Sequence, residues 1–328
     1  MEVRPKKSLG QHFLTDQSVA RAIVDSLSPA TRILEVGPGM GVLTQYLLQR
    51  GTAPSRLGVP DAPSAPSRHE VPAGGSASGS GVLLRSDKKI LASQAPLSSS
   101  SDPITLKVVE IDSESVVYLR EHYPALGPGL LEADFLELPL NKVFAEPFSI
   151  IGNFPYNISS QIFFHILDYR ELVPEVVCMI QKEVAERLAA GPGSKTYGIL
   201  SVLLQMWYDI EYRFTVGEGA FVPPPKVKSA VIRLTRNART DAGCDEALLR
   251  RIVKATFNQR RKTIRNGLRS IGITASPSGP AAPTASAVSS GPPDGSEPAL
   301  PFLDARPEQL SVEDFITLTR AVENARHQ

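Results

Sequence analysis

The residues Arg32-Ile-Leu-Glu-Val-Gly-Pro-Gly-Met-Gly41 decide the fold class of this chain. The first five form a short stretch typical of a buried β-strand, in which Ile33, Leu34 and Val36 are apolar, and the next five contain three glycines. The segment that follows, Thr44–Arg50, has helical character. A strand, a glycine-rich turn and a helix in this order open a doubly wound α/β sheet, so we predict a Rossmann-like fold.

The glycine turn predicts a ligand site when it is combined with an acid on the next strand. Glycines let the backbone approach a ligand, and the helix behind the turn presents free N–H groups. Residues 104–112 predict the second strand, and its Glu110 lies 73 residues after Gly37. Without an intervening low-complexity segment of 52 residues, this spacing is 21. An acid about 20 residues on can accept hydrogen bonds from both ribose hydroxyls, so we predict an adenosine-type nucleoside, with NAD and S-adenosylmethionine both open.

Low-complexity composition interrupts the chain twice. Residues 52–103 and 274–301 are rich in proline, glycine and serine, contain no aromatic residue and hold 14 of the 28 prolines. Such segments bury too little apolar surface to offset their ordering entropy, so we expect both insertions to loop out from the fold. Removing their 52 and 28 residues from the 328 leaves 248, which is enough for two domains.

The remaining segments predict the rest of the fold. Apolar and alternating stretches predict further strands at 130–134, 148–151, 176–181, 209–216 and 227–234. A proline-rich loop joins the last two, so we expect an antiparallel edge on a mostly parallel sheet. After Asn237 apolar residues recur at helical spacing, and Ser311 with Asp314 predicts a capped final helix. We therefore expect an α/β domain over residues 1–237 and a small helical domain over residues 238–328.

Cysteine use and hydropathy exclude several classes of protein. The two cysteines have no CxxC spacing, which excludes a disulfide scaffold and a cysteine-based zinc site. Cys178 lies in an apolar run and is expected to be buried. No apolar stretch approaches the length of a membrane span, and the N-terminus lacks the apolar region of a secretory signal. We therefore expect a cytoplasmic protein that binds no metal, enters no membrane and acts as a monomer.

Charge is unevenly distributed along the chain. The formal net charge is +1, but between Lys226 and Ser270 there are 13 lysines and arginines against 3 acids. This stretch of about +10 also contains the hydrogen-bond donors Asn258, Gln259 and Asn266, which favours a polyanionic partner. Charge alone does not separate RNA from DNA or from an anionic membrane.

The loop Asn153-Phe-Pro-Tyr156 indicates methyl transfer. A side-chain amide directly after a strand can accept a hydrogen bond from an exocyclic amine. Pro155 fixes the backbone so that neighbouring carbonyls can face a substrate, and Tyr156 offers a face on which a base can stack. An amine held by two acceptors points its lone pair at an incoming methyl group. Orientation and electrostatics then carry the rate without a strong base.

These motifs resemble those of the S-adenosylmethionine-dependent rRNA adenine dimethyltransferases. The resemblance is closest to the KsgA-type branch, which dimethylates two adjacent adenosines near the 3′ end of small-subunit rRNA. It covers nearly all of the 248 folding residues and rests on the following stretches, which occur in the family's order: Lys7–Leu14, Gly37–Gly41, Glu110, Asp134, Asn153–Tyr156, Tyr197–Ser201, Phe221–Val227 and Phe257–Asn266.

The resemblance implies roles for individual residues. Contacts with the cofactor S-adenosylmethionine are implied for His12, Leu14, Gly37, Gly39, Glu110, Asp134 and Asn153. In this assignment Glu110 would hold the ribose and Asp134 the adenine amine. Catalysis would rest on Asn153 and the Pro155 carbonyl as acceptors, with the rings of Tyr156 and Phe221 on the two sides of the target base. Phosphates of rRNA in the assembling small ribosomal subunit would contact Arg250, Arg251, Lys254, Arg260, Arg261, Lys262 and Arg265.

The chain departs from the family pattern in several places. His12 replaces the usual Asn, which changes the hydrogen-bonding groups at that contact, and the two low-complexity insertions have no counterpart in the pattern. The nearest rival is the related large-subunit methyltransferase that confers macrolide resistance, against which Phe221–Val227 and Phe257–Asn266 argue. A DNA adenine methyltransferase would more often have proline where Phe154 stands. An assembly factor that only binds RNA would not need all the cofactor residues together.

Overall fold

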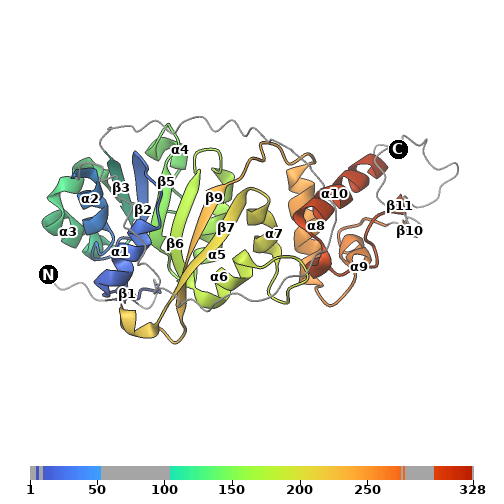
Figure 1. The fold of residues 1–328 in the computed structure, drawn as a ribbon. Coiled ribbons are helices and arrows are strands. Elements are labelled where there is room, and N and C mark those ends of the chain that lie inside the picture. Colours follow the sequence, from blue (N-terminus) through green and yellow to red (C-terminus); the bar gives the residue numbers. More distant parts are fainter. Residues whose placement is uncertain (1–4, 7–9, 53–103, 275, 278–298, 327–328) are drawn as a thin grey trace, which may run out of the picture.

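The fold is built on one seven-stranded sheet. The structure is a computed structural model that describes residues 5–6, 10–52, 104–274, 276–277 and 299–326. Within these residues the strand order of the sheet is β4-β3-β2-β5-β6-β9-β7 (Figure 1). The strands are β2 (Arg32–Val36), β3 (Thr105–Glu110), β4 (Leu130–Glu132), β5 (Ser149–Asn153), β6 (Glu175–Gln181), β7 (Tyr208–Val216) and β9 (Ser229–Arg236).

The strand directions confirm the predicted Rossmann-like α/β sheet. The five strands from β4 to β6 are parallel, and β9 and β7 are antiparallel at one edge. Val36 pairs with Val109 on one side and with Gly152 on the other, so β2, β3 and β5 end at the same level. The loops after these three strands therefore meet at one edge of the sheet, which is where doubly wound folds bind ligands.

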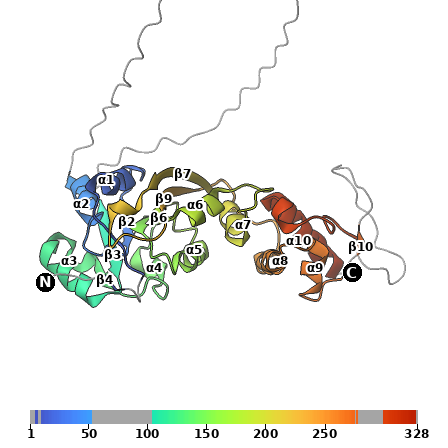
Figure 2. The same ribbon diagram turned by 90° about the horizontal axis from the view of Figure 1, so that it is seen from below.

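Helices cover both faces of the sheet. Successive residues point to opposite faces of a strand, and Ile150 and Ile151 accordingly belong to two separate apolar clusters. The cluster of Ile151 includes α1 (Gln17–Asp25) and α2 (Thr44–Thr52), and that of Ile150 includes α5 (Ser159–Asp168), α6 (Lys182–Ala189) and α7 (Ile199–Gln205). Figure 2 shows α1 and α5 on opposite sides of the strands. Cys178 is fully buried in the second cluster, as predicted.

Shorter elements complete this part of the fold. They are α3 (Ser113–His122), the 3₁₀ turns η2 (Pro124–Gly129) and η3 (Glu218–Ala220), and α4 (Leu140–Val143). A two-residue strand β1 (Phe13–Leu14) pairs with β8 (Phe221–Val222), with Leu14 opposite Phe221. Helices α1 and α6 and the β1–β8 pair have no counterpart in the sequence prediction. Residues 7–9 of the Lys7–Leu14 motif lie outside the described part of the chain.

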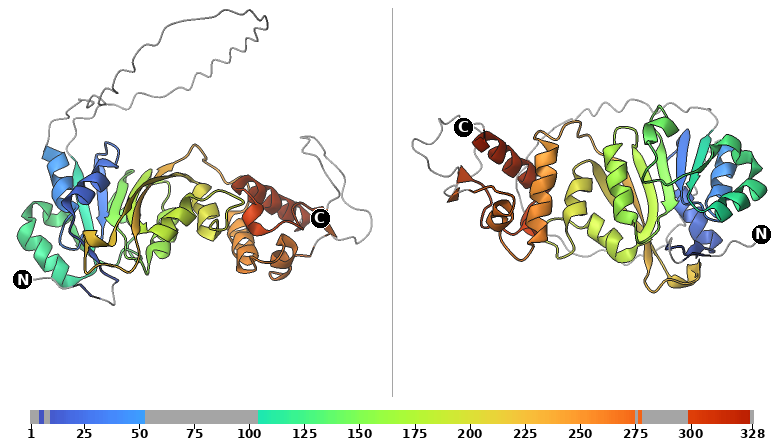
Figure 3. Two further views of the ribbon diagram at one scale, coloured as in Figure 1. Left: turned by 60° about the horizontal axis from the view of Figure 1, so that its bottom comes forward. Right: turned by 180° about the vertical axis from the view of Figure 1, so that it is seen from behind.

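The C-terminal part is helical, as predicted. Its helices are α8 (Glu246–Asn258), α9 (Ile264–Arg269) and α10 (Val312–Arg326), with the 3₁₀ turn η4 (Pro307–Gln309) before the last. They lie at the end of the molecule away from α3, in orange and red in Figure 3. The predicted cap of the last helix is present, because Asp314 accepts a hydrogen bond from the Ser311 backbone and donates its own N–H to Ser311 Oγ. The domain boundary after residue 237 stays a prediction.

The helices share their core with the α/β part. The ring of Phe257 on α8 lies 6.1 Å from that of Tyr197, just before α7, and 6.0 Å from that of Phe315 on α10. All three rings belong to the same apolar cluster as the Ile150 face of the sheet. This continuous contact holds the C-terminal helices against α7.

The two insertions fall largely on residues outside the described ranges. These are residues 53–103, together with 275 and 278–298. The prediction that residues 274–301 loop out as a whole is wrong at its ends, where β10 (Ser276–Pro277) and β11 (Ala299–Leu300) pair in parallel. Leu300 is buried in the core, and burial of this apolar side chain ties the end of the segment to the fold.

Candidate functional site

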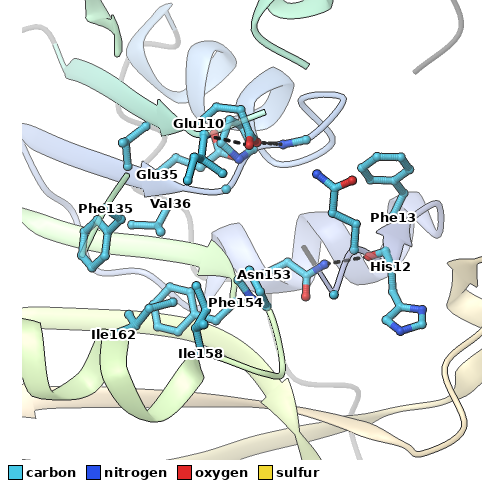
Figure 4. A pocket seen from close by; sticks show the side chains of 18 of the residues that line it. His12, Phe13, Glu35, Val36, Glu110, Phe135, Asn153, Phe154, Ile158 and Ile162 are labelled. Carbon is cyan, nitrogen blue, oxygen red and sulfur yellow. Dashed lines mark hydrogen bonds between the residues drawn. The ribbon is translucent and has the colours of Figure 1, made fainter. Parts of the chain in front are cut away.

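One pocket lies at the edge of the sheet where β2, β3 and β5 end. Its volume is about 300 Å³, and Figure 4 shows side chains from all three strands around it. Nine residues singled out from the sequence line this pocket: His12, Leu14, Gly37, Gly39, Glu110, Asp134, Asn153, Pro155 and Tyr156. The fold therefore brings together side chains that are up to 144 positions apart in the chain.

The glycine turn after β2 has a backbone that requires glycine. Gly37, Gly39 and Gly41 have φ values of 65°, 56° and 77°, in the left-handed region that other residues rarely adopt. A Cβ atom at Gly39 would lie 3.1 Å from the ring of Phe13, and one at Gly37 would lie 4.0 Å from the backbone oxygen of Asn153. Side chains at these positions would fill the space between the turn and its neighbours, so the glycines keep a cradle open for a ligand.

Glu110 holds the loop ends together at the floor of this cradle. Its carboxylate accepts hydrogen bonds from the backbone N–H groups of Gly39, at 3.1 Å, and of Ile111 and Asp112, both at 2.9 Å. Burial raises the pKa of Glu110, and the hydrogen bonds from Asp112 and Gly39 oppose that rise. The side chain is thus fixed in position at the carboxyl end of β3, where a ribose can donate to it.

Asp134 lies on a second wall of the pocket. It follows β4 in a tight turn, and its Oδ1 accepts a 2.8 Å hydrogen bond from the backbone N–H of Leu136. The residue is half-buried and its neighbours Ala133, Phe135 and Leu136 also line the pocket. A carboxylate fixed by its own backbone among apolar neighbours can accept a hydrogen bond from an adenine amine.

Asn153 is the last residue of β5 and faces the N-terminal segment. Its Nδ2 donates a 3.1 Å hydrogen bond to the backbone oxygen of His12 (Figure 4). The next residue, Phe154, is buried, and its N–H donates to the backbone oxygen of Met179 at 3.0 Å. With its NH₂ group donating to His12, Asn153 presents Oδ1 as an acceptor at a position fixed by the sheet.

Tyr156 is held on two sides. Its hydroxyl group lies 2.5 Å from Ser229 Oγ, and its ring stacks on that of His12 with 5.5 Å between centroids and 28° between planes. Burial raises the pKa of Tyr156. His12 Nδ1 lies 2.9 Å from the backbone oxygen of Pro223, and because a carbonyl only accepts, Nδ1 donates. The His12 ring therefore connects Tyr156 to the proline-rich loop, and in Figure 4 it points away from Glu110.

Phe221 is not placed to stack on a base in this conformation. Its side chain is 2% exposed and packs with Leu14 and Val216, and it is not among the pocket-lining residues. Its strand β8 pairs with β1, which turns the ring toward the core rather than toward the pocket. The expectation that Phe221 contacts the target base therefore finds no support here.

Glu35 is a pocket residue that sequence reasoning missed. It is 1% exposed, and Thr44 Oγ1 donates a 2.6 Å hydrogen bond to its carboxylate. Burial, together with the nearby charge of Glu110, raises the pKa of Glu35 to about 8. An acid between the apolar residues Leu34 and Val36 of a predicted buried strand was the signal that could have drawn attention to it, because buried acids are rare without a partner.

Three of the seven basic residues expected to contact phosphates have hydrogen-bond or ion-pair partners within the protein. Arg250 pairs with Asp168 at 3.1 Å and Arg265 pairs with Asp304 at 2.9 Å. Arg260 donates to the backbone oxygen of Ser194. The other four are exposed: Arg251, Lys254, Arg261 and Lys262. No group of acids, histidines or cysteines in the described residues is arranged to hold a metal, and no described helix is long and apolar enough to span a membrane.

The fold and the pocket together define a class of enzyme. The sheet is mostly parallel, a glycine cradle follows its first strand in the chain, and an acid ends the second. An Asn-Phe-Pro-Tyr loop follows the fourth. This combination defines a class I methyltransferase dependent on S-adenosylmethionine. Two solved structures have a similar fold. They are a dimethyladenosine transferase from Plasmodium falciparum (TM-score 0.62, 18% identity, 96% of this chain and 98% of that one) and the 23S rRNA methyltransferase ErmE (TM-score 0.53, 20% identity, 95% and 99%).

Sequence comparison identifies the family. The model of the ribosomal RNA adenine dimethylase family matches residues 3–53 and 103–279, and the chain belongs to this family. Its relatives include the "Ribosomal RNA small subunit methyltransferase A" of Phocaeicola vulgatus, 48% identical over 98% of this chain and 91% of the relative. That of Porphyromonas gingivalis is 45% identical over 97% of this chain and 98% of its own length. The two matched ranges leave out residues 54–102, most of the first insertion.

Proposed function

We propose that the protein dimethylates the exocyclic amines of two adjacent adenosines near the 3′ end of small-subunit rRNA, during ribosome biogenesis. The observation that carries this proposal is the placement of Asn153, Pro155 and Tyr156 on one wall of a pocket whose other walls contain Glu110 and Asp134. The names of the relatives at 45–48% identity support the small subunit as the source of the RNA.

The residues of the pocket divide into two groups by chemistry. Glu110 and Asp134 are fixed acceptors for ribose hydroxyls and an adenine amine, and the glycine cradle makes room for the ligand between them. Bound S-adenosylmethionine would supply a methyl group already activated by its sulfonium charge. No residue therefore needs to activate the donor, and the chain's own contribution is to bind it and to orient the acceptor amine.

Asn153 and Pro155 would orient the acceptor amine. The Oδ1 atom of Asn153 and the backbone oxygen of Pro155 can each accept one N–H bond of an adenine amine. Two acceptors hold this nitrogen close to tetrahedral geometry, with its lone pair directed at the methyl group. The hydrogen bond from Asn153 Nδ2 to His12 fixes the amide against rotation. The proton lost after transfer leaves through one of these acceptors to water.

Tyr156 would hold the target base. The base must leave its stack to enter the pocket, which costs a few kcal/mol, and stacking on an aromatic ring returns part of that cost. The Tyr156 ring is held by His12 on one face and through its hydroxyl by Ser229, so its orientation is set before RNA arrives. An unpaired loop in the rRNA suits this arrangement because its bases are the easiest to extrude.

Four exposed basic residues of the C-terminal helical part would bind the RNA substrate. Arg251, Lys254, Arg261 and Lys262 are exposed beside the α/β part and would contact phosphates of the assembling small subunit. The enzyme would act as a monomer in the cytoplasm, where subunits assemble. Arg250 and Arg265, which pair with carboxylates, would contribute less to phosphate binding than the four exposed residues.

The test compares Asn153→Ala with the unchanged protein on ribosomal subunits from a strain that lacks the modification. We expect Asn153→Ala to lower the rate of methyl transfer to small subunits at least about 100-fold, because one fixed acceptor is lost, while methyl-donor binding only weakens. Gln161→Ala, on the exposed side of α5, is the matched control and should keep full activity. Label appearing in large subunits instead, or full activity of Asn153→Ala, would refute the proposal.

A further inference from the structure

A second hollow lies across α5 from the pocket. Ile158 and Ile162 line the pocket, whereas Ser160 and Phe164, which point the other way from α5, line the second hollow. Its volume is about 590 Å³, and its remaining walls come from α6, the start of α7 and the carboxyl end of α8. We call it the α5–α8 groove. Since α5 begins three residues after Tyr156, the groove adjoins the loop expected to hold the target base.

The groove is positively charged and has an apolar floor. Arg187, Lys254 and Arg260 line it, and no aspartate or glutamate among the described residues does. Glu183 and Glu308, outside the lining, pair with the two arginines. Leu188 and Phe257 form part of its floor. A cationic rim over an apolar and aromatic base matches the two parts of a nucleotide, its phosphate and its base.

Lys254 is the cation best placed to meet a ligand. Its Nζ lies 5.5 Å from the centre of the Phe164 ring, and its side chain is exposed. A cation over an aromatic face keeps its N–H donors available, because the ring supplies no hydrogen-bond acceptor atom. The Lys254 ammonium group therefore lies at the rim of the groove, and the Phe164 ring forms part of its wall.

The two arginines keep donors available as well. Arg260 donates one N–H to the backbone oxygen of Ser194 at 3.3 Å, and its Nε lies 4.0 Å from the carboxylate of Glu308, but a guanidinium group carries five donors in all. Arg187 pairs with Glu183 one turn earlier on α6, at 2.8 Å. Both partners of that pair are substantially exposed, so water screens their attraction and an incoming phosphate can compete for the arginine.

We propose that the α5–α8 groove binds one unpaired nucleotide of the rRNA, close to the target adenosine in the same strand. The inference rests on the proposed function and adds a second contact for the substrate. The base would lie against Phe164 and the apolar floor, with Asn258 available to hydrogen-bond its edge, and its phosphate would face Lys254. The two sites lie on opposite sides of α5, which with its side chains is roughly 10 Å across, so an extended strand needs about two nucleotides or more to reach from one to the other.

The first experiment measures the KM for unmethylated small subunits. Lys254→Glu should raise this KM about tenfold or more, with kcat and methyl-donor affinity unchanged, because a phosphate contact becomes a repulsion. Phe164→Leu keeps the charge and removes the ring, and should raise the KM about fivefold. The control is Arg269→Glu, an exposed arginine on α9 outside the groove, for which we expect less than about a twofold change. Circular dichroism and thermal melting show that each variant is folded.

The pattern of results decides between a specific site and general attraction. If Lys254→Glu and Arg269→Glu raise the KM equally, or if Phe164→Leu has no effect, the groove does not hold a nucleotide. Photo-crosslinking of the enzyme on 4-thiouridine-labelled small subunits should place RNA adducts on α5 or on the carboxyl end of α8. RNA adducts that fall only in peptides outside α5 and the carboxyl end of α8 would overturn the proposal.

A failure of the proposed function can be recognised separately. If the unchanged protein does not methylate small-subunit rRNA, the function fails, and the groove is then tested by direct binding of a short single-stranded RNA. Lys254→Glu should weaken that binding and lower its dependence on salt concentration by about one phosphate contact. Equal binding by the variant and the unchanged protein would show that the groove takes no part.

Discussion

Replacing Glu35 with glutamine should change how the stability of the protein depends on pH. In the folded protein Glu35 is buried with one hydroxyl partner, Thr44, and its pKa is raised to about 8. In the unfolded chain the carboxyl group is in water and titrates at its ordinary pKa of 4.5. Between these two values the unfolded state releases the proton while the folded state retains it.

The sign of the effect follows from this difference. A carboxyl group whose folded-state pKa is raised contributes its full stability below pH 4.5 and loses it as the pH rises through about 8. The two pKa values differ by about 3.5, and each pKa unit corresponds to about 1.4 kcal/mol, which gives an upper bound of about 5 kcal/mol. Part of this change falls outside the range from pH 5 to pH 8.5, and rearrangement around an ionised Glu35 reduces it further, so we expect the free energy of unfolding to fall by about 2–4 kcal/mol over that range through this group.

Urea unfolding at pH 5, 7 and 8.5 measures the effect directly. Glu35→Gln cannot ionise and still accepts the hydrogen bond from Thr44, so its stability relative to the unchanged protein should rise with pH. Glu137→Gln, an exposed acid beyond β4, serves as the control and should show no such trend. A difference between Glu35→Gln and the unchanged protein that stays constant across this pH range would refute the reasoning, because Glu35 would then titrate alike in both states.

Three further substitutions test other parts of the site and fold. Gly41→Ala should weaken methyl-donor binding and lower the free energy of unfolding by ~1–2 kcal/mol from backbone strain alone, because the φ of Gly41 is 77°. The added Cβ would also lie 2.4 Å from the Tyr123 ring. The control Gly191→Ala, whose Cβ would meet nothing within 4 Å, should leave methyl-donor binding unchanged in a titration. Ser311→Ala removes the α10 cap and should cost about 1 kcal/mol in thermal unfolding, with methylation unchanged. His12→Leu removes the ring contact with Tyr156 and the bond to Pro223, and should raise the KM for RNA more than the Kd for methyl donor; the opposite order would place the ring at the donor.

Sequence reasoning found most of the pocket because its residues lie where strands end. The glycine turn directly follows β2, Glu110 ends β3 and Asn153 ends β5, so the positions of these residues follow once the strands are recognised. Parallel strands then bring their carboxyl ends to one edge without further information. The spacing of 21 residues between Gly37 and Glu110, counted without the insertion, likewise follows from the ends of two neighbouring strands.

The remaining features depend on contacts between distant segments. Phe221 is buried because β8 pairs with β1, and nothing local in its proline-rich surroundings indicates that pairing. The stacking of His12 on Tyr156 joins residues 144 positions apart in the same way. Glu35 is an intermediate case. Its apolar neighbours Leu34 and Val36 are visible in the sequence, but its burial also requires α2 to cover the strand end and to bring Thr44 to its carboxylate.

The β1–β8 pair also sets the order in which the pocket can form during synthesis. Leu14 leaves the ribosome early, but its partner Phe221 is made 207 residues later, which at about 5–20 residues per second is a delay of roughly 10–40 s. Until then the wall formed by residues 10–14 has no strand to pair with, although all the glycine, Glu110 and Asn153 positions are already complete. A nascent chain that ends before β8 therefore has the central strands of the sheet without a closed pocket, and translation must pass the proline-rich loop before the pocket can close.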